Sequence, residues 1–85
     1  MDTKQTLSQL IEQAKSFGLP DQDVKNSNEM LKYHEYELCL DLLLTQLYEY
    51  NIMISQQFYD LFLKISNKIK IDPEKYNFIK EMIGR

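Results

Sequence analysis

Cys39 and His34 are the side chains best suited to covalent or acid–base chemistry, because this 85-residue chain contains one cysteine and one histidine. A thiolate activated by an imidazole is a common nucleophilic pair. The two residues stand five positions apart, so on one helix their side chains would diverge by about 140°. Cys39 also lies in the most apolar segment of the chain, which favours a buried, unreactive thiol. A small enzyme that uses Cys39 or His34 is therefore the least favoured interpretation.

The sequence contains no other motif that would hold a catalytic group or a cofactor. One cysteine and one histidine are too few for a structural zinc site. There is no glycine-rich phosphate loop, no nucleophile elbow and no HExxH pattern. We therefore predict no catalytic residues, no metal, no cofactor and no small-molecule substrate.

Acidic and tyrosine side chains in the middle of the chain indicate a protein-binding surface instead. Residues 33–37 alternate tyrosines with acids, and tyrosine provides contact area at a low entropy cost. Four polar residues follow at four-residue steps, at 37, 41, 45 and 49. They form either an ordinary solvated line or an acidic patch that faces a basic protein. The predicted partner-binding residues are Glu29, Tyr33, Glu35, Glu37, Asp41, Tyr48, Glu49 and Tyr50.

Charge is distributed unevenly along the chain, whose formal net charge is −3. Residues 19–60 contain eight acidic and two basic side chains, a net charge of −6. Residues 61–85 contain six basic and three acidic side chains, a net charge of +3. The overall negative charge argues against general nucleic-acid binding, which depends on neutralising phosphates.

Apolar residues recur at helical spacing in five segments, which predicts helices over 3–17, 21–33, 36–50, 56–69 and 73–83. Gly18 can end the first helix in the left-handed conformation, and Ser55 and Asp72 are suited to cap the last two. The second helix has the least certain start, since Asp21 or Asp23 could cap it and residues 26–28 could form a turn. The 36–50 helix is apolar around most of its circumference, which is typical of a central helix.

Length and composition predict a single all-α domain over residues 1–85, a compact bundle of four to five short helices. A chain of this size buries enough surface for one small core. A lone cysteine cannot form an internal disulfide, and no segment has the apolar core of a signal peptide or a membrane span. We therefore expect a cytoplasmic protein that does not interact with membranes.

The order of these pieces resembles that of MafI-type immunity proteins of bacterial polymorphic toxin and contact-dependent growth inhibition systems. The resemblance covers about residues 29–83, with an acidic and aromatic start at 35–37, an apolar helix, a Leu-x-Glu end at 47–49, an Ile-Ser turn at 54–55 and Ile-Asp-Pro-Glu at 71–74. In two places this chain departs from the pattern: it has Cys39 where a small residue such as alanine is usual, and His34 where glycine is typical.

This resemblance implies a small cytoplasmic helical protein that binds one cognate toxin domain, often a nuclease, and neutralises it. Many toxin nucleases are basic because their substrate is polyanionic, so an acidic helical surface would suit such a partner. The alternative is a helical adaptor or a transcriptional regulator. A DNA-reading element would then have to come from the basic residues 61–85.

Overall fold

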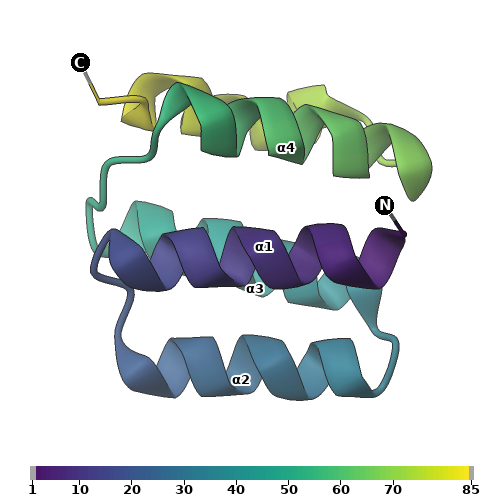
Figure 1. Ribbon diagram of the computed structural model, residues 1–85. Coiled ribbons are helices and arrows are strands. Elements are labelled where there is room, and N and C mark those ends of the chain that lie inside the picture. The colour runs from purple at the N-terminus through teal and green to yellow at the C-terminus, as the bar shows by residue number, and fades with distance from the viewer. Residues whose placement is uncertain (1, 85) are drawn as a thin grey trace.

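The computed structural model describes residues 2–84 and folds them into α-helices and one 3₁₀ segment (Figure 1), which confirms the all-α prediction. The elements are α1 (Thr3–Ser16), α2 (Asp21–Lys32), α3 (Tyr36–Glu49), α4 (Gln56–Lys68) and η1 (Pro73–Met82). None of the helices in this part of the chain is long and apolar enough to cross a membrane.

The helices form three levels around one core (Figure 1). α1 and α3 lie in the middle, α2 packs against both from one side, and α4 and η1 cover the opposite side. α3 buries Cys39, Leu40, Leu43, Leu44 and Leu47 completely. α3 is thus the apolar central helix that the sequence predicts, and α1 shares this central level with it.

Each α-helix ends in the same hydrogen-bonded turn, in which the residue after the C-cap adopts a left-handed conformation. Gly18 does so after α1 with φ 111°, as predicted. His34, Asn51 and Lys70 do so after α2, α3 and α4, with φ between 53° and 60°. Left-handed φ is unfavourable for residues that carry a Cβ, and asparagine tolerates it best. Because residues other than glycine adopt this conformation after α2, α3 and α4, the chain ends all four α-helices in this way although it contains only two glycines.

The predicted helix caps agree with the structure at two places and differ at one. Ser55 Oγ accepts a hydrogen bond from the Phe58 amide at 3.0 Å, and Asp72 Oδ1 accepts one from the Glu74 amide at 3.0 Å. α2 begins directly after Pro20 with no side-chain cap, so the predicted cap at Asp21 or Asp23 was wrong. α2 also continues without a turn through residues 26–28.

The last element differs from the α-helix predicted for residues 73–83. It is a 3₁₀ segment interrupted at Tyr76, whose φ and ψ of −119° and 37° are not helical. The break accompanies the burial of the Tyr76 ring, which is 3% exposed and hydrogen-bonds to α3. Beyond it, Ile83 forms an isolated parallel bridge with Ile54. This bridge joins the end of η1 to the segment between α3 and α4.

Candidate protein-binding surface

A groove of about 400 Å³ lies between α2 and α3 on the outside of the bundle. α2 contributes Asn26, Glu29 and Met30, the following link contributes Tyr33 and Glu35, and α3 contributes Leu42. Three of the eight predicted partner-binding residues, Glu29, Tyr33 and Glu35, thus come together here. The helical period brings them together from α2, because positions 26, 29, 30 and 33 share one face.

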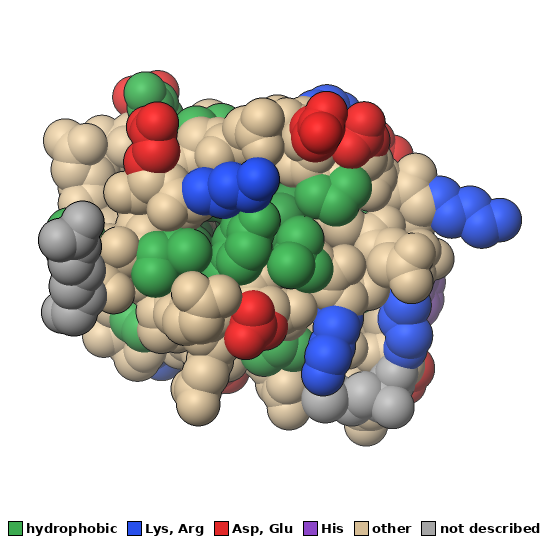
Figure 2. All heavy atoms as spheres, turned by 90° about the horizontal axis from the view of Figure 1, so that it is seen from above, with side chains coloured by type: hydrophobic (Ala, Val, Ile, Leu, Met, Phe, Trp, Pro, Cys, Tyr) green, Lys and Arg blue, Asp and Glu red, His purple; other side chains and the backbone are tan. Residues whose placement is uncertain are grey.

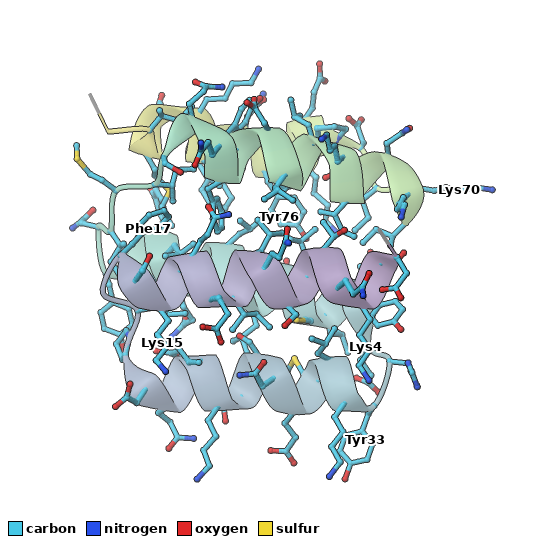
Figure 3. All side chains as sticks on the ribbon, in the orientation of Figure 1. Lys4, Lys15, Phe17, Tyr33, Lys70 and Tyr76 are labelled. Atoms are coloured by element: carbon cyan, nitrogen blue, oxygen red, sulfur yellow. The ribbon has the colours of Figure 1, made fainter. Side chains whose placement is uncertain are left out.

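Apolar side chains are exposed to solvent in and beside the groove. Tyr33 is 64% exposed, and Leu38 is 54% exposed one turn before Leu42 on α3. Met30 and Leu42 are half-buried. Figure 3 shows Tyr33 at the end of α2, projecting away from the bundle. Exposed apolar side chains gathered in one place are typical of protein-binding sites, whereas scattered ones are ordinary.

The two carboxylates that line this groove are exposed and are not held in ion pairs within the described part of the chain. Within residues 2–84, neither Glu29 nor Glu35 forms an ion pair or a side-chain hydrogen bond. The nearby Lys32 places its Nζ 5.9 Å from the centroid of the Tyr33 ring. α3 carries three acidic side chains and no basic one. The groove therefore combines apolar contact area with unpaired negative charge.

A buried polar pair stands next to this groove, and sequence reasoning missed it. Gln46 Nε2 donates to Asp23 Oδ1 at 2.9 Å, and Asp23 is only 8% exposed. Asp23 precedes Asn26 by one turn of α2, and Gln46 follows Leu42 by one turn of α3. The hydrogen bond joins the two helices at that end. Buried polar side chains need such partners, but sequence spacing does not reveal a pair from different helices.

The opposite flank of α3 contacts η1 and is already occupied. The Tyr76 hydroxyl donates to Asp41 Oδ1 at 2.9 Å, and Figure 3 shows Tyr76 extending from η1 into the bundle. Burial raises the pKa of Tyr76, and the hydrogen bond to Asp41 and the negative charges of Asp41 and Glu37 raise it further. Lys75 Nζ lies 3.7 Å from Glu37 Oε1. Both carboxylates thus have partners within the chain.

The remaining predicted residues lie at the C-terminal half of α3. Tyr48 packs edge-on against Phe78 of η1, with ring centroids 4.9 Å apart. Glu49 ends α3, and the next residue, Tyr50, is 52% exposed. The eight predicted residues therefore occupy the groove, the η1 flank and the end of α3. η1 packs on one side of the acidic line of α3, so Glu37 and Asp41 contact η1 while Glu29 and Glu35 line the groove.

Cys39 and His34 are directed to different surroundings. Cys39 is fully buried, its Sγ lies 3.3 Å from the Ser27 carbonyl oxygen, and burial raises the pKa of its thiol to about 11. His34 is exposed, and its Nδ1 lies 2.8 Å from the Tyr36 hydroxyl. A thiol that stays protonated at neutral pH is a poor nucleophile. Among residues 2–84, no group of three His, Cys, Asp or Glu side chains could hold a metal ion.

A second hollow, between α1 and α4, has the opposite charge. It has a volume of about 470 Å³ and is lined by Thr6, Leu61, Lys64, Asn67 and Lys68. The molecule therefore has a basic hollow on α4 and an acidic groove between α2 and α3. Comparison of the chain with protein families, curated proteins and solved structures found no match. The fold and the groove define a small helical protein whose surface groove is lined by both acidic and apolar side chains.

Proposed function

We propose that this protein is an immunity protein, a stoichiometric inhibitor that binds and neutralises a cognate toxin domain. The observation that carries the proposal is the groove between α2 and α3, where exposed apolar side chains lie beside the unpaired carboxylates of Glu29 and Glu35. An apolar centre bordered by charge is the composition of a specific protein interface. Its negative sign suits a basic partner.

The resemblance to MafI-type immunity proteins supports this proposal through one backbone position. Glycine is typical of that family where this chain has His34. His34 adopts φ 60°, in the left-handed region that glycine occupies most easily. The backbone of this chain thus has, at the family's glycine position, a conformation that glycine would favour, and this turn sets the link between α2 and α3 and places Glu35 beside the groove.

A toxin nuclease is the partner class that this charge suits best, because an enzyme that cleaves a polyanion needs a basic surface. The acidic groove would compete for that surface by occupying it, and no bond would be made or broken. Attraction between opposite charges would speed the encounter and set the orientation of the complex. The inhibitor would act in the cytoplasm, without catalysis and without a cofactor.

The decisive experiment co-expresses this chain with the toxin domain encoded beside it. We expect the host to survive and the two proteins to co-purify in equal amounts. The matched control is the same chain with Glu29→Lys and Glu35→Lys, which should fold but protect poorly. Host death with the wild-type chain, together with no complex, would contradict the proposal. Strong retention of the chain on a polyanion column at moderate salt would instead favour the adaptor or regulator.

A further inference from the structure

The pair formed by α2 and α3 has one side filled by its own chain and one side open. α1 packs against both helices on the inner side (Figure 1), and its buried residues include Leu7, Leu10 and Ile11. The groove lies on the outer side, where its lining residue Tyr33 is 64% exposed. Leu38, one turn of α3 before the lining residue Leu42, is 54% exposed. α1 thus shows how a helix packs against this pair, and the outer side lacks such a helix.

We infer that this groove receives an amphipathic, basic helix of the partner protein, and this inference rests on the proposed function in taking a protein as the partner. The apolar ridge of that helix would lie on Met30, Leu38 and Leu42. Lysine or arginine side chains next to the ridge would lie beside Glu29 and Glu35. Placing an apolar helix face in a groove is a recurrent mode of recognition, with anchors at helical spacing.

The shape of the groove favours a helix with an apolar ridge. Two packed helices present a furrow between them, and a third helix can seat one ridge of side chains in it. Here Met30 on α2 and Leu42 on α3 line the furrow together. Leu38 extends the apolar surface by one turn of α3. An apolar ridge with anchors at i, i+3 or i+4, and i+7 would match this length.

The negative charge of the groove favours a basic helix. Glu29 and Glu35 line the groove from α2 and from the link, and neither forms an ion pair within residues 2–84. α3 adds no basic side chain, and Lys32 of α2 lies over the Tyr33 ring. A basic helix would neutralise the two carboxylates, and an acidic helix would be repelled by them.

The face formed by α4 and η1 is the other candidate surface, and it gives no preference for a partner charge. Figure 2 shows hydrophobic side chains at the centre of this face, with both basic and acidic side chains around them. Leu63 on α4 is 37% exposed, less than the 54% of Leu38 on α3. The residues that line the groove between α2 and α3 include two acidic side chains and no basic one, so apolar surface and one charge sign coincide in its lining.

The experiment selects helical peptides of about 18 residues, roughly five turns, from a randomised display library against the full chain. We expect the enriched peptides to pair an apolar ridge with flanking Lys or Arg, and their amide cross-peak shifts to map to α2 and α3. Their Kd should rise about tenfold with Leu38→Ser and about a hundredfold with Glu29→Lys plus Glu35→Lys. Matched controls are Leu63→Ser and the exposed pair Glu12→Lys plus Glu81→Lys, which should leave Kd nearly unchanged.

Acidic peptides, peptides without helical spacing, peptides that map to α4 and η1, or no enrichment would each overturn the inference. Concentration-dependent dimerisation abolished by Glu29→Lys plus Glu35→Lys would also overturn it, because a second copy would then occupy the groove. The proposed function fails separately. If basic helices bind the groove but co-expression does not protect the host, the inference holds and the immunity role does not. If the Glu29→Lys plus Glu35→Lys variant protects the host as well as the wild type, the immunity role holds and the inference about the groove fails.

Discussion

Carboxylates lie on both sides of α3, and the two sides differ in whether these carboxylates have partners within the chain. On the η1 flank, Asp41 accepts a hydrogen bond from Tyr76 and Glu37 lies beside Lys75. On the α2 flank, the side chains of Glu29 and Glu35 line the groove with the exposed Tyr33 and form no ion pair or hydrogen bond within residues 2–84. The comparison teaches that the availability of a carboxylate depends on what packs beside it.

Reversing the charge of the groove should have the largest effect. With Glu29→Lys plus Glu35→Lys, we expect Kd for the toxin domain to rise about a hundredfold, since each lost close charge pair contributes about 1.4 kcal/mol. The change should come mainly from a slower association rate at low salt, measured by stopped-flow or surface plasmon resonance. The melting temperature should stay unchanged because both side chains are exposed.

Glu12→Lys plus Glu81→Lys is the matched control, because it changes the net charge equally at exposed positions outside the groove. Equal association rates for the two double variants, at low and at high salt, would remove the groove from the interface.

Deleting the Tyr76 hydroxyl should affect stability and leave binding unchanged. Tyr76→Phe should lower the free energy of unfolding at pH 7 by about 1.5 kcal/mol, the contribution of a hydrogen bond to a charged acceptor. Denaturant titration measures this loss. Because folding raises the pKa of Tyr76, the wild-type contribution is complete below the unfolded pKa of about 10 and declines as the pH rises further. Tyr76→Phe should make the alkaline loss of stability shallower.

Tyr59→Phe is the control for this variant, because no hydrogen bond of the Tyr59 hydroxyl links α4 to another element within residues 2–84. An alkaline stability profile of Tyr76→Phe identical to that of the wild type would show that the buried hydroxyl is not responsible.

Removing one charge from the η1 flank should have the smallest effect. Glu37→Gln should change the free energy of unfolding by less than about 0.5 kcal/mol, because Glu37 and Lys75 are both mostly exposed. It should also leave Kd for the toxin domain almost unchanged. Glu35→Gln, with the same loss of charge on the other flank, should raise Kd about tenfold. Isothermal titration calorimetry compares the pair. A larger loss of affinity for Glu37→Gln would place the η1 flank in the interface and contradict the division of α3.

Three groove residues could be predicted from the sequence, and the shape of the groove could not. Glu29, Tyr33 and Glu35 were predicted from their charge and aromatic character, whereas Leu38 and Leu42 were noted only as part of a helix that is apolar around most of its circumference. A helix that is apolar around most of its circumference carries more apolar surface than one core needs, and that excess was the available signal. The sequence does not say which leucines stay outside, because this depends on where α2 and η1 pack.

The sequence by itself determined the helices α1 to α4, the caps at Ser55 and Asp72 and the turn at Gly18, because these depend on residues within a few positions of each other. Only the tertiary structure decided the left-handed turns at His34 and Lys70 and the break at Tyr76. It also decided which carboxylates of the acidic middle remain free. Tyr76 and Asp41 lie 35 positions apart, and helical periodicity carries no information at that separation.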